Sequence, residues 1–204
     1  MACRNTVRNY AEDANYHIYN RGIDSREIFQ DEQDYMTFLD LLKRHLSREE
    51  HKDKRGKVYE TYAGRIELLS YCLTPNHFHL LFYLNNDPIA IPELIRKVAG
   101  AYTRYFNKKN NRIGTLFQGV YKSTQIVGDP NLLHTTRHIH RRPEDYYNWA
   151  FSSLNYYIGE LKSDWVLPDR IYRLYDWGTY ENYLNNHEEH KVRGLEMQGF
   201  LADN

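Results

Sequence analysis

The most informative stretch for predicting the fold of this chain is Tyr71-Cys-Leu-Thr-Pro-Asn-His-Phe-His-Leu-Leu-Phe82. Two apolar runs flank a Thr-Pro-Asn turn, a pattern that predicts a β-hairpin. Side chains alternate along a strand, so His77 and His79 project from one face and Phe78 projects from the other. Two neighbouring imidazoles on a strand can fill two ligand positions of a divalent metal, supported from behind by Asn76. The alternative is that hydrogen bonds satisfy both rings at the surface of the sheet.

Outside the hairpin, hydrophobic periodicity predicts strands and helices in a mixed order. We expect extended segments at 16–20, 58–62, 65–73, 77–84 and 113–127, and helices at 30–46, 91–107, 129–142, 152–161 and 179–192. Asp31 is expected to cap the first helix. The order strand, helix, hairpin, helix, strand, helix favours an α+β fold, with a ferredoxin-like antiparallel sheet and helices packed on it. We expect this catalytic or binding domain at 1–143 and a helical C-terminal extension packed on it at 144–204.

Composition and charge narrow the class of protein. The chain has 204 residues, 41% hydrophobic and 26% charged, which excludes a disordered or membrane-spanning class. Formal net charge is zero, but residues 94–127 hold seven basic and no acidic residues, with aromatic residues between them. This mixture is typical of a surface for single-stranded nucleic acid, and the alternative is a solvated helix face with its aromatics buried. The residues that we expect to contact nucleic acid are Arg21, Arg104, Tyr105, Lys108, Lys109 and Lys122.

The two ends of the chain carry less information. The first residues lack an apolar segment typical of a signal peptide, and no long apolar run is present, so we expect a cytoplasmic location without membrane association. From Pro143 onward the chain has 11 acidic and five basic residues. Because Trp side chains are largely buried in folded proteins, we expect Trp149, Trp165 and Trp177 to extend the core.

Several ordered motifs resemble one family. The hairpin stretch resembles the signature strand of the single-tyrosine HUH transposases, named for His, hydrophobic, His, and is most similar to the REP-associated tyrosine transposases. The further matching stretches are Tyr16-His-Ile-Tyr-Asn-Arg-Gly22, Ile28-Phe29 with Asp34-Tyr35, Ala101-Tyr-Thr-Arg-Tyr-Phe-Asn-Lys-Lys109 and Gly114-Thr-Leu-Phe-Gln-Gly-Val-Tyr-Lys122. The resemblance covers roughly residues 16–159.

The resemblance implies a mechanism as well as a fold. It implies Mg²⁺ or Mn²⁺ at His77 and His79, a single-stranded or hairpin DNA substrate, and a monomer or homodimer. It also implies a tyrosine, on a helix after the last strand, that attacks a phosphodiester and forms a covalent 5′-phosphotyrosine, so that the strand is nicked and rejoined. Such a covalent step splits one difficult exchange into two easier ones.

The chain departs from this family at the reacting positions. The nucleophile helix of the family usually reads Arg-Tyr-Ile-His-x-Asn-Pro, whereas this chain reads Arg137-His-Ile-His-Arg-Arg-Pro143. His138 therefore stands at the nucleophile position, and Arg142 replaces an Asn that reaches the metal in the family. A guanidinium cannot ligate a metal, but it binds phosphate well.

Three explanations remain open at this point. The chain has lost cleavage and kept DNA binding; another group, such as His138, Tyr146 or Tyr147, supplies the nucleophile; or the chain is an altered variant of an active enzyme. A transposase with strand-transfer activity and a cleavage-dead DNA-binding derivative are thus the leading hypotheses. An RNA-binding module is a third, which gives the His-x-His pair no role.

Overall fold

A four-stranded sheet forms the centre of the molecule. The computed structural model describes residues 9–159, 161–174 and 179–185. The strands are β1 (Ala14–Arg21), β2 (Ile66–Thr74), β3 (His77–Leu84) and β4 (Lys122–Ile126). The longer helices are α1 (Glu32–Leu46), α2 (Ala90–Lys109) and α3 (Asp129–His140); the short ones are η1 (Ile23–Ser25), α4 (Leu154–Tyr157), α5 (Asp169–Tyr172) and α6 (Tyr180–Asn185).

The strand order confirms the ferredoxin-like prediction. Neighbouring strands run in the order β2-β3-β1-β4 and every pair is antiparallel. The predicted hairpin is present, with β2 and β3 joined at Thr74 and His77. The helix that begins at Glu32 has Asp31 as its N-cap, whose side chain accepts from the Asp34 backbone N–H at 3.1 Å.

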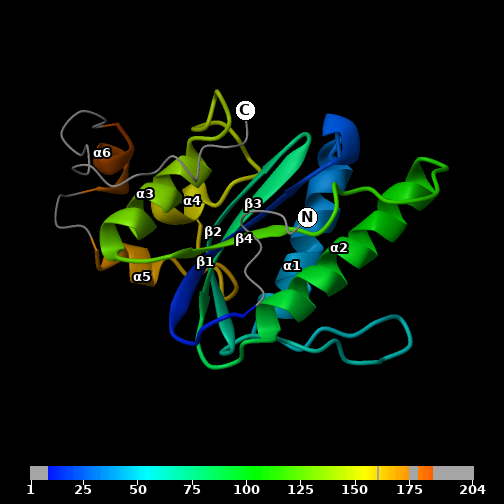
Figure 1. The fold of residues 1–204 in the computed structure, drawn as a ribbon, viewed down its shortest axis with the longest axis horizontal. Coiled ribbons are helices and arrows are strands. Elements are labelled where there is room, and N and C mark those ends of the chain that lie inside the picture. Colours follow the sequence, from blue (N-terminus) through cyan, green and yellow to red (C-terminus); the bar gives the residue numbers. More distant parts are fainter. Residues whose placement is uncertain (1–8, 160, 175–178, 186–204) are drawn as a thin grey trace.

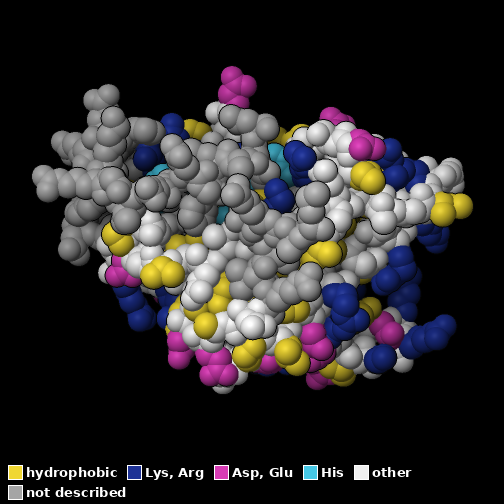
Figure 2. All heavy atoms as spheres, in the orientation of Figure 1, with side chains coloured by type: hydrophobic (Ala, Val, Ile, Leu, Met, Phe, Trp, Pro, Cys, Tyr) yellow, Lys and Arg dark blue, Asp and Glu magenta, His cyan; other side chains and the backbone are white. Residues whose placement is uncertain are grey.

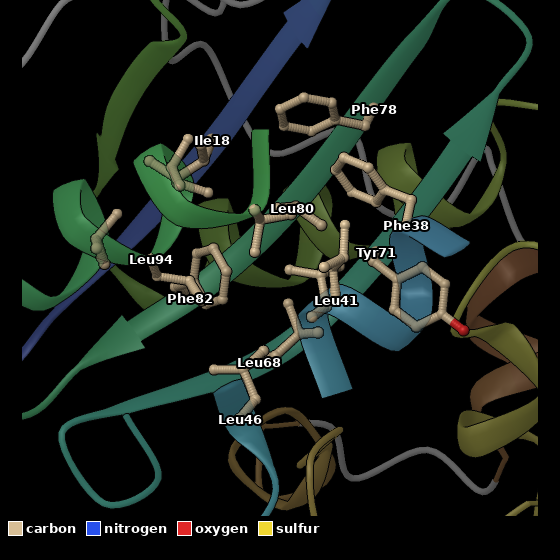
Figure 3. Close-up of a cluster of buried hydrophobic side chains, with 14 of the residues drawn as sticks. Ile18, Phe38, Leu41, Leu46, Leu68, Tyr71, Phe78, Leu80, Phe82 and Leu94 are labelled. Carbon is tan, nitrogen blue, oxygen red and sulfur yellow. The ribbon is translucent and has the colours of Figure 1, made fainter. Parts of the chain in front are cut away.

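Helices cover both faces of the sheet. Figure 1 shows α1 and α2 on one side, and α3 and α4 on the other. Figure 3 shows the core under α1 and α2, where Phe78 and Phe82 of β3 point toward Phe38 and Leu94 of the helices. Because Phe78 enters this core, the alternating His77 and His79 face α3 instead.

Some predicted elements are shorter or absent. Residues 58–62 form no strand, because their backbone turns to the end of α1, where the Tyr62 N–H donates to the His45 carbonyl at 2.7 Å. The segment 113–127 is extended in a sheet only from Lys122, since Gly114 and Gly119 adopt φ of 99° and 67°, which a strand does not tolerate. The helix expected at 152–161 covers only Leu154–Tyr157, and that at 179–192 begins at Tyr180 and is described to Asn185.

The described part of the C-terminal region packs on the sheet. Trp165 is buried against the same core as α1, and Trp149 Nε1 donates to the Leu73 carbonyl at 2.8 Å. Trp177 lies outside the described residues. The division of the chain at 143 stays a prediction. No helix within the described ranges has the length and apolar character needed to cross a bilayer.

Candidate metal and nucleic-acid site

A cluster of rings lies on the α3 face of the sheet. Strand register places Tyr19 of β1 opposite His79 of β3, and Tyr19 opposite Lys122 of β4. The rings of His17, Tyr19 and His79 stack, with centroids 5.0–5.6 Å apart. From α3, His138 approaches the same stack, 6.4 Å from His79 and nearly perpendicular to it. The sheet and α3 thus bring His138, the predicted nucleophile position, to the His-x-His strand.

Both nitrogens of the His79 ring are engaged. His79 is only 3% exposed. Its Nδ1 lies 2.9 Å from His17 Nε2, and its Nε2 lies 3.3 Å from Arg142 Nε. Because a guanidinium only donates, His79 Nε2 accepts, which leaves the proton on Nδ1 to be donated to His17. A chain of donated hydrogen bonds therefore runs from Arg142 through His79 to His17.

His17, His79 and His138 are held in the neutral form. Burial, with smaller electrostatic contributions from His138 and Arg142, lowers the pKa of His17 to about 3. Burial and then the neighbouring His17 hold the pKa of His79 well below its usual value. Burial and the Arg142 charge lower the pKa of His138 to about 4. At neutral pH, Arg142 is therefore the cation among these side chains.

The other predicted metal ligand is less enclosed. His77 is partly exposed, and its ring centroid lies 5.0 Å from that of His79 with the planes at 88°. Its Nδ1 lies 2.6 Å from Asn76 Oδ1. The amide oxygen accepts this proton and orients the ring, which is the kind of supporting contact expected of Asn76.

This arrangement does not fit Mg²⁺ or Mn²⁺. A neutral imidazole has one lone pair for a metal, and that of His79 accepts from Arg142. Within the described ranges, no group of three or more His, Cys, Asp or Glu side chains is placed to hold a metal ion.

The residues expected to contact nucleic acid separate into two groups. Arg21 and Lys122 lie on the face of the histidine cluster: Arg21 pairs with His77 in register, and Lys122 Nζ sits 5.3 Å from the centre of the Tyr19 ring. Arg104, Tyr105, Lys108 and Lys109 lie on α2, which covers the opposite face of the sheet. Figure 2 shows Lys and Arg side chains gathered on the right of the view, over α2 and nearby loops.

Two of these α2 residues, Lys109 and Tyr105, bind acidic side chains at the start of α1. Lys109 Nζ forms ion pairs with Asp31 and Asp34, each at 2.6 Å, and Tyr105 OH donates to Asp34 Oδ1 at 2.9 Å. Arg104 and Lys108 are exposed. Part of the basic run therefore serves to join α1 to α2.

Sequence reasoning missed His17 and Tyr19 as members of the site. The signal was present, because period-two alternation in β1 places His17, Tyr19 and Arg21 on one face. What the pattern alone does not supply is the pairing of β1 beside β3, which brings these rings onto His79.

A ferredoxin-like sheet whose His-hydrophobic-His strand faces the helix after its last strand, here α3, is typical of the HUH class of nucleic-acid proteins. Within it, the chain belongs to the family described as transposase IS200-like, whose sequence profile matches residues 10–142. No curated protein matches the chain.

Two solved structures are similar to this chain. One is a REP-associated tyrosine transposase bound to a REP hairpin, with 14% identity, a TM-score of 0.54, and coverage of 85% of this chain and 94% of that one. At this identity the likeness concerns the fold. The other is a protein of Deinococcus radiodurans R1, provisionally named a transposase, with 17% identity, a TM-score of 0.40, and coverage of 67% and 96%.

Proposed function

We propose that this chain binds single-stranded or hairpin DNA on the α3 face of its sheet and does not cleave it. Membership of the IS200-like family supports DNA as the ligand. A structural relative has been seen with a REP hairpin, which supports a hairpin in particular. The observation that carries the proposal is the contact of Arg142 Nε with His79 Nε2, because it engages the nitrogen that a catalytic metal would need.

The α3 face offers groups suited to an unpaired strand. Tyr19 is partly exposed at the edge of the ring stack, and an aromatic face of this kind stacks on bases. Lys122 lies beside it, and Arg21 is exposed at the end of β1. Stacking by Tyr19 and phosphate contacts from Arg21, Lys122 and Arg142 together make a binding surface that reads little sequence.

The covalent step lacks its usual tyrosine. Tyr146 and Tyr147, the tyrosines that follow α3, pack on each other with centroids 4.6 Å apart. Their hydroxyls are engaged by α6, because Tyr146 OH donates to Asn185 Oδ1 at 3.2 Å and Tyr147 OH accepts from Asn185 Nδ2 at 3.0 Å. Neither tyrosine is presented to the His79 ring in this arrangement.

One observation favours a second candidate function, strand transfer through His138. Burial and the Arg142 charge lower its pKa to about 4, so at neutral pH the imidazole is unprotonated and a ring nitrogen keeps its lone pair. Attack of the unprotonated ring nitrogen on a phosphodiester would form a P–N bond and break the P–O3′ bond. The departing oxygen would leave as a 3′-hydroxyl, taking up the proton that the other ring nitrogen loses. The Arg142 guanidinium, whose charge acts on the His138 ring, would stabilise the negative charge that develops on the phosphate.

An adduct assay separates the two candidates. The full chain is incubated with an end-labelled DNA hairpin that carries a single-stranded flank, in Mg²⁺, in Mn²⁺ and in EDTA. We expect a shifted band on a native gel with no nick and no SDS-resistant adduct. An acid-labile adduct lost in His138→Gln would support strand transfer instead. A chain that binds neither hairpin nor single-stranded DNA would overturn the proposal, and tighter binding to the matching RNA hairpin would favour the RNA-binding alternative.

A further inference from the structure

We propose that the Arg142 guanidinium takes the place of a divalent metal at this site, so that the chain holds a DNA phosphate by a fixed charge and needs no metal ion. This inference rests on the proposed function, because it assumes that DNA lies on the α3 face. It names a DNA phosphodiester as the ligand at this position, and it assigns Arg142 as the group that binds this phosphodiester.

The backbone delivers Arg142 to the sheet by a short extension of α3. The helix ends at His140, and the Arg142 N–H continues the turn by donating to the Ile139 carbonyl at 3.4 Å. Pro143 follows and disfavours further helix. The side chain of Arg142 then reaches back across the face of the sheet, where its Nε meets His79 Nε2 at 3.3 Å.

The hydrogen-bond directions fix Arg142 in place without neutralising it. His79 Nε2 accepts a hydrogen bond from Arg142 Nε, and His17 Nε2 accepts one from His79 Nδ1, so neither ring offers the guanidinium a negative charge. Among the described residues, no carboxylate forms an ion pair with Arg142. A half-buried cation with neutral neighbours favours an anion as its partner.

The geometry of the guanidinium suits a phosphate. Arginine carries its N–H donors in a planar fork, and Nε accounts for one of them here. No group among the described residues accepts a hydrogen bond from either terminal nitrogen of Arg142. Such a fork binds two oxygens of one phosphate. Its positive charge stabilises the phosphate as a divalent cation does in a nuclease site.

Affinity in the presence and absence of metal tests the proposal. Binding of the full chain to the DNA hairpin is measured by fluorescence anisotropy in EDTA, in Mg²⁺ and in Mn²⁺ at one ionic strength. The wild-type affinity is expected to agree within about twofold across the three buffers. Arg142→Asn is expected to weaken binding in EDTA by about tenfold or more, the loss of a charge-assisted pair. Mg²⁺ or Mn²⁺ is expected to restore part of that loss.

Two further variants separate charge from structure. Arg142→Lys keeps the charge and removes the fork, so its affinity in EDTA should fall between those of wild type and Arg142→Asn. Arg104→Asn removes the same charge from the exposed face of α2 and should bind with the same affinity with and without metal. Thermal unfolding of each variant shows whether it is folded at the assay temperature.

Each outcome decides one question. Wild-type binding that disappears in EDTA would overturn this inference and leave the proposed function standing. Equal affinities of wild type and Arg142→Asn in EDTA would also overturn it, because the arginine would then be only a structural plug over His79. Absence of DNA binding under all conditions would instead defeat the proposed function itself.

Discussion

His140 is expected to make the folded state lose stability in mild acid. Its side chain is fully buried, Nδ1 lies 2.7 Å from Tyr180 OH, and Nε2 lies 2.7 Å from Ser153 Oγ. Burial lowers its pKa to about 3. The test compares wild type with His140→Gln as the pH is lowered from 8 to 5. The glutamine keeps a polar group in reach of Ser153.

The size of the effect follows from proton linkage. The unfolded chain binds a proton at His140 with a pKa near 6.5, and the folded chain does not until about pH 3. Between these two pH values the unfolded state binds one more proton than the folded state. The contribution of neutral His140 to the free energy of unfolding is therefore complete above pH 6.5, and below it the free energy of unfolding falls by about 1.4 kcal/mol per pH unit. From pH 8 to pH 5 this amounts to about 2 kcal/mol for His140. His17, whose pKa is also lowered to about 3, contributes a similar loss.

Urea unfolding at pH 8, 6 and 5 measures this loss as a difference in the free energy of unfolding. His140→Gln is expected to be less stable than wild type at pH 8, yet to lose about 2 kcal/mol less between pH 8 and pH 5. The difference should persist in 1 M salt, because it comes from burial and not from a screened charge pair. An equal loss in wild type and variant would contradict this prediction, since His140 would then bind its proton with the same pKa in the folded and unfolded states.

Three other outcomes are expected. His17→Phe removes the acceptor of His79 Nδ1–H, so the free energy of unfolding should fall by about 1–3 kcal/mol in urea titrations; an unchanged value would contradict the hydrogen-bond chain. Lys122→Ala should reduce the slope of log K for DNA against log salt concentration by about 0.7, because one phosphate contact is lost. Lys108→Ala, on the opposite face, should leave this slope unchanged. The reverse result would indicate that DNA binds at α2. Phe78→Ala empties a buried position and should cost about 3–5 kcal/mol; a loss below 1 kcal/mol would contradict its place in the core.

Local sequence determined the hairpin and its facing side chains. Thr-Pro-Asn fixes the turn, and period two then requires that Phe78 and His79 face opposite sides, which the burial of Phe78 in the α1 side confirms. The prediction failed where glycine conformation mattered, because an apolar and aromatic run such as 113–121 gives no sign that Gly114 and Gly119 bend it away from the sheet.

The chemistry of the site depends on long-range contacts that local patterns do not contain. Arg142 and His79 are 63 residues apart, and their contact exists only because α3 packs across β3. The basic run on α2 was interpreted as one surface, yet Lys109 is paired with Asp31 and Asp34 from a helix about 75 residues earlier. Charge counted along a sequence therefore overstates the charge that a face presents.

His138 and Arg142 are the two positions at which this chain departs from the family motif, and they lead to a prediction about restoring cleavage. A divalent ion and a guanidinium about 5 Å apart repel by about 7 kcal/mol at an effective dielectric constant of about 20, so this site holds one or the other. His138→Tyr alone supplies a nucleophile but retains the Arg142 contact on His79, and it should form no adduct.

His138→Tyr with Arg142→Asn removes that contact and should form an acid-stable phosphotyrosine adduct with a DNA hairpin in Mg²⁺ or Mn²⁺. Arg142→Asn alone is the matched control, since it opens the metal position without a tyrosine. An adduct from His138→Tyr in EDTA would contradict the coupling, because the guanidinium would then support cleavage as well as a metal does. A folded double variant that binds DNA and metal but never reacts would show that the loss of cleavage extends beyond these two positions.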